Sequence, residues 1–368
     1  MIEEDYMRLA IQLAMQTKHQ TSPNPPVGAV LVKDGKVIGF GAHLVAGEAH
    51  AEVIAIDMAR ENVANATLFV TLEPCSHHGK TPPCTQYIMD HGIARVVVAC
   101  QDRHDQVAGR GIAMLRDAGV VVDVGLLASE AMPLYDVFFH QITTKMPFVT
   151  VKTAMSLDGK TATATLESKW ITNETARNDA HQYRHLYDAI LVGVNTVLHD
   201  NPQLTTRVQS GRNPIRIIMD THLRTPLEAN VMTDGAAPTW MIVGSSVRPD
   251  KIAAYEKNPD VRVIQLDTDT IPIKAMLARL YEENITSVYV EGGATINGAF
   301  LRERCMDQLI LYIAPMIIGG KQAPGPFLGE GFSRLQEALQ MDIQDVAMMD
   351  GQIKVVATKE ESTCLPEL

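Results

Sequence analysis

Apolar and polar positions follow two different periods along the first 145 residues, which predicts that helices and strands alternate there. Apolar residues recur at the spacing of one helix face over residues 5–15, and the proline-rich turn at residues 22–26 ends that helix. Two apolar runs flank Asp34-Gly35, a pair typical of tight turns, so we expect a hairpin. The elements expected in this half are strands at residues 27–32, 37–41, 67–72, 95–100 and 120–124, and helices at residues 5–15, 50–60, 84–91 and 109–118.

The pattern is interrupted around residues 143–147, where we expect the boundary between domains of residues 1–145 and 146–368. Strands that alternate with helices are typical of an α/β fold, and the early hairpin makes the first sheet mixed rather than purely parallel. Roughly the last ten residues are expected to form a loose tail. The second half is expected to have strands at residues 148–154, 189–194, 215–220, 240–243, 261–265, 287–291 and 308–315, and helices at residues 173–185, 273–283 and 294–303.

Composition and charge exclude two classes of protein. Of the 368 residues, 46% are hydrophobic and 20% are charged, which is enough apolar material for two cores and excludes disorder of the whole chain. The net charge is −11: residues 1–145 carry 11 basic and 16 acidic side chains, and the remainder carries 21 and 27. Because neither half has a basic surplus, we expect no extended nucleic-acid-binding surface, although a local pocket for one or two phosphates stays open.

The cysteines and the N-terminal residues point to a reduced compartment. The five cysteines Cys75, Cys84, Cys100, Cys305 and Cys364 are an odd number in a long chain, which is not typical of a disulfide framework. The chain starts Met-Ile-Glu-Glu-Asp, acidic where a signal peptide is basic. No apolar stretch approaches the roughly 18 residues of a membrane span. We therefore expect a cytoplasmic protein with no membrane partner.

The clearest chemical signal is His50-Ala51-Glu52, followed by Pro74-Cys75 and, after eight further residues, Cys84. One imidazole and two thiolates leave a fourth tetrahedral position open, as in catalytic rather than structural zinc sites. A zinc ion there would lower the pKa of a bound water towards 7. Glu52 lies two residues from His50, so it could move a proton from that water to a departing amine without binding the metal. This order of residues is the signature of zinc-dependent nucleobase deaminases.

Each part of this pattern also has a simpler interpretation. A His-x-Glu sequence is common on the solvated face of a helix, and two cysteines can be buried, unreactive thiols. The order of the residues, at a helix start and a strand end, favours the zinc interpretation. The spacing departs from the usual deaminase pattern, in which two residues rather than eight separate the cysteines, so the substrate framed by this loop must differ.

The second half has weaker chemical signals. It contains no Gly-x-Gly-x-x-Gly sequence after its first strand and no Walker sequence. Residues 290–298 end a strand in paired glycines and open onto a helix, whose N–H groups could bind a cofactor phosphate, unless the glycines only form a tight turn. Lys152 and Asp200 are expected at the ends of adjacent strands, where they would either position and protonate a reacting sugar or form a surface ion pair.

Three segments of the first half together carry a family resemblance. They are the loop Cys75-Ser76-His77-His78-Gly79-Lys80-Thr81-Pro82-Pro83-Cys84, the turn Pro23-Asn24-Pro25-Pro26-Val27-Gly28, and Gly41-Ala42-His43-Leu44. These segments resemble the deaminase half of the bifunctional deaminase–reductases of riboflavin biosynthesis (RibD type), in which the extended loop replaces the short Cys-x-x-Cys. The eight-residue spacing thereby supports the resemblance.

The resemblance implies a cytidine-deaminase-like α/β/α sandwich with one zinc ion. In that interpretation His50, Cys75 and Cys84 are the metal ligands and Glu52 is the proton shuttle. Four further positions match the family's substrate pocket, and Lys80 among them suits a substrate phosphate; a turn asparagine and surface histidines and lysine are the alternative. These positions are Asn24, His43, His77 and Lys80.

The resemblance continues through the second half and implies a dihydrofolate-reductase-like domain that uses NADPH. The positions that match NADPH contacts are Ala154, Trp170, Thr196, Asp200, Thr221, Gly293, Ala294, Thr295, Ile296, Asn297, Gly298 and Ala299. Those that match substrate contacts are Ser168, Arg184, Leu204, Arg207 and Glu291, of which the two arginines suit a ribose 5-phosphate. Lys152 and Asp200 would support hydride transfer, although that chemistry belongs mainly to the cofactor.

The resulting hypothesis is a two-domain enzyme of riboflavin synthesis that acts on a small pyrimidine ribose phosphate. The first domain would hydrolytically deaminate 2,5-diamino-6-(5-phosphoribosylamino)pyrimidin-4-one. The second would use NADPH to reduce the ribosyl group to ribityl, giving 5-amino-6-(5-phosphoribitylamino)uracil. The resemblance also implies a homo-oligomer.

Two other hypotheses predict different observations. A tRNA or free-nucleobase deaminase would show RNA-dependent deamination, although the acidic charge of both halves and the long cysteine loop argue against tRNA. A zinc-stabilised binding protein without chemistry would need a fourth protein ligand, for which His77 and His78 are candidates. In that case Glu52→Gln would leave function intact.

Overall fold

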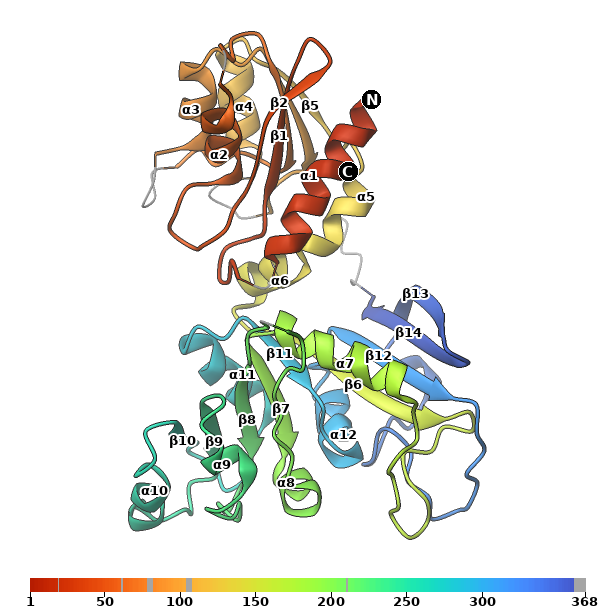
Figure 1. Cartoon of the computed structure of the whole chain (residues 1–368). Coiled ribbons are helices and arrows are strands. Elements are labelled where there is room, and N and C mark those ends of the chain that lie inside the picture. The colour runs from red at the N-terminus through yellow and green to blue at the C-terminus, as the bar shows by residue number, and fades with distance from the viewer. Residues whose placement is uncertain (19, 61, 78–81, 104–107, 210, 361–368) are drawn as a thin grey trace. The chain divides into compact units, whose positions relative to one another are not determined.

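The computed structural model describes residues 1–360 except residues 19, 61, 78–81, 104–107 and 210. It divides into two compact units, unit 1 over Met1–Lys145 and unit 2 over Met146–Leu368. Each unit has its own sheet and its own apolar clusters (Figure 1). The expected C-terminal tail falls largely at residues 361–368, outside the described residues.

Unit 1 is built on a five-stranded mixed sheet with the strand order β2-β1-β3-β4-β5. Strand β1 is antiparallel to β2 and β3, whereas β3, β4 and β5 are parallel. Asp34 and Gly35 both have positive φ in the turn of the first hairpin, the geometry that Asp-Gly favours, so the predicted hairpin and mixed sheet are confirmed. The strands are β1 (Gly28–Lys33), β2 (Lys36–Ala42), β3 (Thr67–Leu72), β4 (Arg95–Cys100) and β5 (Val121–Val124).

Helices cover both faces of this sheet, which confirms the predicted three-layer sandwich (Figure 1). One face packs against α1 (Glu3–Thr17) and the short helices that end the unit, and the other against α2, α3 and α4. Neighbouring residues of one strand, such as Val30 and Leu31, therefore belong to different apolar clusters. The remaining helices are α2 (Ala51–Met58), α3 (Cys84–Asp90), α4 (Arg110–Asp117), α5 (Ala128–Ala131), η1 (Met132–Leu134) and α6 (Asp136–Thr144).

Unit 2 is built on a nine-stranded sheet with the order β10-β9-β8-β7-β11-β6-β12-β14-β13. Seven strands are parallel, and β13 with β14 forms an antiparallel hairpin at one edge that the apolar pattern did not predict. The strands are β6 (Phe148–Ser156), β7 (Ala189–Gly193), β8 (Ile215–Met219), β9 (Thr239–Val243), β10 (Val261–Gln265), β11 (Ser287–Val290), β12 (Gln308–Ala314), β13 (Met341–Met349) and β14 (Gln352–Lys359).

Helices also cover both faces of the parallel part of this sheet. The predicted helices α7, α11 and α12 are confirmed, and α7 begins where the Asn173 side chain accepts the N–H of Ala176 at 2.9 Å. In the described part of the chain, no helix combines the length and apolar character needed to cross a membrane. The helices are α7 (Glu174–Leu186), α8 (Val194–Asp200), α9 (Asn230–Thr233) and α10 (Pro249–Tyr255) on one face, α11 (Ile273–Glu282) and α12 (Ala294–Arg302) on the other, and the turn η2 (Leu335–Glu337).

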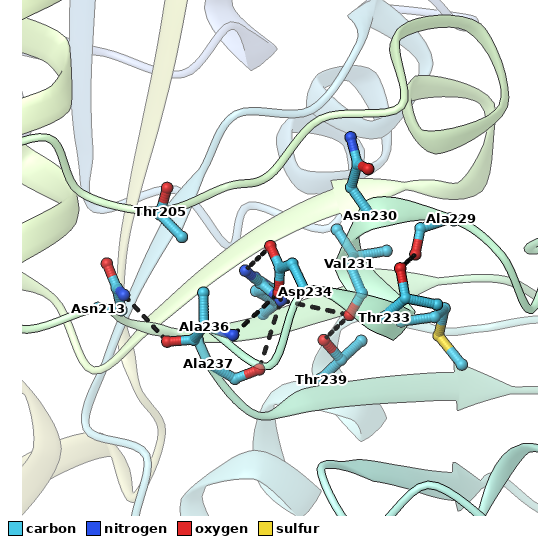
Figure 2. A network of polar contacts seen from close by, with 12 residues as sticks. Thr205, Asn213, Ala229, Asn230, Val231, Thr233, Asp234, Ala236, Ala237 and Thr239 are labelled. Carbon is cyan, nitrogen blue, oxygen red and sulfur yellow. Dashed lines mark hydrogen bonds and ion pairs between the residues drawn. The ribbon is translucent and has the colours of Figure 1, made fainter.

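A buried arginine fixes the segment between β8 and β9. Arg216 has no exposed surface and donates to the two carboxylate oxygens of Asp234 at 2.7 and 2.8 Å. It also donates to the carbonyl oxygens of Val231 at 3.3 Å and Ala237 at 3.4 Å. Figure 2 shows Asp234, Val231 and Ala237 around this point, with Thr239 donating its hydroxyl to the carbonyl of Val231 at 2.6 Å. The guanidinium thereby holds the whole turn against the sheet.

Candidate functional site

The three predicted metal ligands of unit 1 meet at one point although they come from three elements. His50 precedes α2, Cys75 follows β3, and Cys84 is the first residue of α3. His50 Nδ1 lies 3.2 Å from Cys84 Sγ and 3.6 Å from Cys75 Sγ, and the three atoms lie within 4.8 Å of one another. One imidazole nitrogen and two sulfurs are ligands that zinc prefers, so these residues fit the ion.

The pKa values of the two thiols are shifted in opposite directions. Hydrogen bonds from Cys84 and from His50 lower the pKa of the Cys75 thiol, and the same contact with Cys75 raises the pKa of the Cys84 thiol. The backbone N–H of Cys84 also donates to Cys75 Sγ at 3.3 Å. Because a metal binds thiolate, this arrangement prepares Cys75 as a ligand.

Glu52 lies beside this cluster in the first turn of α2 but is not part of it. Its side chain is buried, and burial raises the pKa of its carboxyl. A buried carboxyl in this position is placed to accept a proton and to return it. Among the described residues, no fourth His, Cys, Asp or Glu joins the three ligands.

Two of the four predicted pocket residues of unit 1 lie next to the metal cluster. Asn24 Nδ2 lies 3.2 Å from His43 Nε2, and His43 Nδ1 lies 3.2 Å from the carbonyl oxygen of Ala49. The carbonyl can only accept a hydrogen bond, so His43 carries its proton on Nδ1. Burial lowers the pKa of the His43 imidazole. Its ring meets the His50 ring edge-on at 5.2 Å.

The other two predicted pocket residues lie in the loop between Cys75 and Cys84. His77 is exposed in that loop and is not one of the three clustered ligands. Lys80 and His78 fall at residues 78–81, outside the described residues.

The predicted substrate residues of unit 2 include a buried charged cluster. Arg184 on α7 donates through Nε and an Nη atom to the two carboxylate oxygens of Glu291 at 2.7 and 3.1 Å, and through its other Nη to the carbonyl of Thr205 at 2.9 Å. Lys152 Nζ lies 3.6 Å from the same carboxylate. Burial alone would raise the pKa of Glu291, but Arg184 and Lys152 outweigh it and hold that pKa at about 2.

The expectation that Lys152 and Asp200 end adjacent strands is wrong. Lys152 is inside β6, Asp200 is the last residue of α8, and β11 lies between β6 and β7. Lys152 pairs with Glu291, whereas Asp200 pairs with Lys169 at 2.6 Å. The misplacement arose because the sequence did not reveal that β11, from far along the chain, inserts between the first two strands of the unit.

The predicted cofactor residues gather at the carboxyl ends of parallel strands. Gly293 precedes α12, whose first residues are Ala294 to Ala299, after β11. Thr196 is in α8 directly after β7, Thr221 comes two residues after β8, and Ala154 is near the end of β6. Since β8, β7, β11 and β6 are neighbours in the sheet, these residues lie along one edge, where open α/β sheets bind ligands.

The remaining predicted residues of unit 2 differ in their exposure. The indole of Trp170 is exposed, with the Arg177 guanidinium 4.5 Å over its ring. Ser168 and Arg207 are also exposed. Leu204 packs in the core, so only its backbone is available to a ligand.

Two residues that the sequence analysis did not select also lie at these sites. His181 on α7 is near the charged cluster: burial first, then Arg184 and Arg207, lower its pKa to about 4. Glu73, two residues before Cys75, is buried and accepts four backbone N–H groups. A glutamate at the end of an apolar strand is the one sequence signal that could have pointed to Glu73.

Two family models match the chain, one in each unit. The model described as "Cytidine and deoxycytidylate deaminase zinc-binding region" matches residues 1–100. The model described as "RibD C-terminal domain" matches residues 147–355. The three clustered ligands thus lie inside the first match, and the charged cluster and the sheet edge of unit 2 lie inside the second.

Similar proteins cover nearly the whole chain. A "Riboflavin biosynthesis protein RibD" of Bacillus amyloliquefaciens is 49% identical over 364 residues, which cover 98% of this chain and 97% of that protein. The protein of the same name from Escherichia coli (strain K12) is 39% identical over 360 residues, covering 94% and 96%.

Solved structures agree over the same length. RibD of Acinetobacter baumannii (form 1) has a TM-score of 0.84 and 36% identity and covers 97% of this chain and 99% of its own. A diaminohydroxyphosphoribosylaminopyrimidine deaminase/5-amino-6-(5-phosphoribosylamino)uracil reductase of Thermotoga maritima has a TM-score of 0.85 and 37% identity, covering 97% and 98%.

Proposed function

Because the chain belongs to the RibD family of bifunctional deaminase–reductases of riboflavin biosynthesis, we propose that each unit catalyses one of two consecutive reactions. Unit 1, residues 1–145, removes the C2 amino group of 2,5-diamino-6-(5-phosphoribosylamino)pyrimidin-4-one by hydrolysis. Unit 2, residues 146–368, reduces the ribosyl group of the product to ribityl with NADPH. The observation that carries the proposal is the His50, Cys75 and Cys84 cluster beside a buried Glu52.

In unit 1, His50, Cys75 and Cys84 would hold a zinc ion, which would supply a bound water acidic enough to act as a nucleophile near neutral pH. Glu52 accepts the proton of the attacking water and returns it to the departing amino group, which leaves as ammonia. The buried position of Glu52 excludes bulk water from this exchange.

Asn24 and His43 orient the pyrimidine at this site. The hydrogen bond between them, and the bond from His43 Nδ1 to the carbonyl of Ala49, fix both side chains next to His50. The family resemblance also assigns His77 and Lys80 to the substrate, Lys80 to its phosphate.

In unit 2 the charged cluster binds the ribose 5-phosphate. Arg184 uses three of its five N–H donors within the protein, which leaves two for a phosphate, and Arg207 provides a second guanidinium. Burial first, and then the positive charges of Arg184, Arg207 and Lys152, lower the pKa of His181. Ser168, Leu204 and Glu291 complete the substrate site, and Glu291 keeps Arg184 and Lys152 in place.

NADPH would supply the hydride of the second step, and the carboxyl edge of the sheet is where it would bind. The N–H groups at the start of α12, after Gly293, would bind a phosphate of the cofactor, since a helix N-terminus favours anions. Thr196, Thr221 and Ala154 lie along this edge, and Trp170 and Asp200 complete the proposed cofactor contacts. Lys152, which pairs with Glu291, and Asp200, which pairs with Lys169, would support hydride transfer to the sugar. We also propose that the chain is cytoplasmic and forms a homo-oligomer. Sedimentation of the purified chain would measure its oligomeric state.

Mass spectrometry of the diaminopyrimidine substrate tests both steps at once. After incubation with the zinc-loaded protein alone, we expect the exchange of one amino group for oxygen, and a gain of two hydrogens only when NADPH is added. Glu52→Gln should block the first change and retain reduction of the already deaminated substrate. Asp200→Asn should do the reverse.

Two outcomes would contradict the proposal. An unchanged substrate mass with zinc-loaded protein would mean that the substrate is different, and a free nucleobase would then be tried. Full deamination activity in Glu52→Gln would show that Glu52 is not the proton shuttle.

A further inference from the structure

Glu73 is a buried carboxylate whose described partners are all backbone N–H groups. It lies between the end of β3 and the ligand Cys75, and its side chain is 4% exposed. Oε1 accepts the N–H groups of Gly111 at 2.9 Å and Ile112 at 3.2 Å. Oε2 accepts those of Gly109 at 3.0 Å and Asp102 at 3.2 Å.

These four bonds offset the cost of burying the charge. A buried carboxylate without hydrogen bonds is strongly destabilising, whereas one that accepts several N–H groups at a helix start is stabilised by them and by the helix dipole. Three of the donors belong to the start of α4, residues 109–112, and the fourth follows β4. Glu73 therefore ties α4 and the end of β4 to the backbone next to Cys75.

The backbone of Pro74, the residue after Glu73, is also in close contact with α4. A Cβ atom added to Gly111 would lie 2.1 Å from the carbonyl oxygen of Pro74, so only glycine permits this approach. The carbonyl of Cys75 in turn accepts the N–H and the hydroxyl of Thr85, each at 3.2 Å. The backbone of residues 73–75 is thus held on one side by α4 and on the other by α3, which carries the ligand Cys84.

We infer that Glu73 is a positioning residue of the metal site, which fixes the backbone of Pro74 and Cys75 so that Cys75 Sγ stays within reach of His50 and Cys84. This inference rests on the proposed zinc ligands. It adds a residue that neither binds the metal nor touches the substrate. The alternative is that Glu73 only caps α4 and contributes to stability without influencing the metal.

The test compares zinc affinity in the wild type, Glu73→Gln and Gly111→Ala by competition with a chelator. In Glu73→Gln one oxygen becomes an NH₂ group, which cannot accept the two N–H groups that faced it, so the backbone must shift. We expect zinc affinity to fall about 10–100-fold, the range for residues that orient metal ligands. Gly111→Ala should weaken binding too, because it displaces Pro74 while leaving the carboxylate intact.

Glu303→Gln is the matched control. Glu303 also accepts two backbone N–H groups at the start of a helix, those of Ile273 at 2.9 Å and Lys274 at 3.0 Å, but it lies in unit 2. This variant should lose stability without changing zinc affinity. Because Glu73 and Gly111 lie in unit 1, the calorimetric transition of that unit without metal checks that the two variants are folded.

Cobalt substitution separates positioning from simple capping. Two thiolates bound to Co²⁺ give a sulfur-to-metal absorption band, and we expect Glu73→Gln to weaken that band as Cys75 leaves its position. A folded Glu73→Gln protein with the wild-type spectrum and wild-type zinc affinity would overturn the inference. If the proposed zinc ligands were wrong, the result would differ: the wild type would not bind one zinc ion, or Cys75→Ser would still bind it.

Discussion

At the scale of single residues, the charge of Glu291 is the most consequential in unit 2. Its carboxylate neutralises two cations that are themselves largely buried, Arg184 and Lys152. Glu291→Gln keeps the shape but removes the negative charge that pairs with both cations, so we expect a loss of about 3–5 kcal/mol in the free energy of unfolding. Urea unfolding followed by tryptophan fluorescence measures this, because both tryptophans, Trp170 and Trp240, are in unit 2.

The control for that change is Glu283→Gln. Arg262 donates to both oxygens of Glu283 at 2.7 Å, the same two-point pairing, but this pair is more exposed. Its loss should cost under about 1 kcal/mol. Equal costs for the two substitutions would mean that burial does not decide the strength of the Glu291 cluster.

The low pKa of Glu291 also gives stability a defined pH dependence. The pKa is about 2 in the folded chain and about 4.3 in an unfolded one, so the folded state binds fewer protons between these values. The stabilisation is therefore complete above about pH 4.3 and is lost as the pH falls towards 2. In Glu291→Gln this part of the acid dependence should disappear.

The sequence predicted that His50, Cys75 and Cys84 come together, and the structure clusters them. That prediction follows from residue types and order, because zinc chemistry requires those types. Lys152 and Asp200 were misplaced relative to each other because their positions depend on strand order. Glu73 was missed because its partners are backbone groups, which carry no mark in the sequence.

At the scale of elements, the Arg216–Asp234 pair decides whether the turn between β8 and β9 stays on the sheet (Figure 2). Asp234→Ala leaves a guanidinium with no exposed surface unpaired, so we expect a loss of about 3–5 kcal/mol. Arg216→Met should cost less, since Asp234 is near the surface and can be hydrated. Urea unfolding of both single variants and the double variant gives the coupling.

In the double variant no buried charge remains, so we expect it to be more stable than Asp234→Ala. Additive losses, or a larger loss for Arg216→Met than for Asp234→Ala, would contradict this account.

Element prediction succeeded for the parallel strands but missed the β13–β14 hairpin and the short helices of residues 128–144. Parallel strands are buried on both faces and read as continuous apolar runs, so their signal does not depend on the partner strand. In the β13–β14 hairpin the apolar residues Ile343, Val346 and Met348 are exposed, and the pairing shifts between Ile343 and Asp345. Strand β13 therefore has no clear alternation of apolar and polar residues. In residues 128–144, Pro133 breaks the helical turns into pieces too short to show periodicity.

At the scale of the whole molecule, metal removal should affect one unit only. The apolar clusters of units 1 and 2 share no residue, and the proposed zinc ligands all lie in unit 1. Zinc at about 1,000 times its dissociation constant stabilises the unit that binds it by about 4 kcal/mol. Chelation should therefore lower the calorimetric transition of unit 1 and leave the tryptophan-detected transition of unit 2 unchanged.

The control for chelation is Cys75→Ser, whose transitions should not respond to the chelator. A shift of both transitions in the wild type would show that the two units unfold together.

The central place of β6 in the sheet of unit 2 has a consequence during synthesis on the ribosome. Strand β6 pairs with β11 and β12, and β11 begins only about 130 residues after β6 ends. At roughly 5–20 residues per second, this apolar strand waits about 7–26 s for its first neighbour. Unit 1 contains all the partners of its own strands and can fold in that interval. The nascent chain is thus most dependent on chaperones while β6 is made and β11 is not.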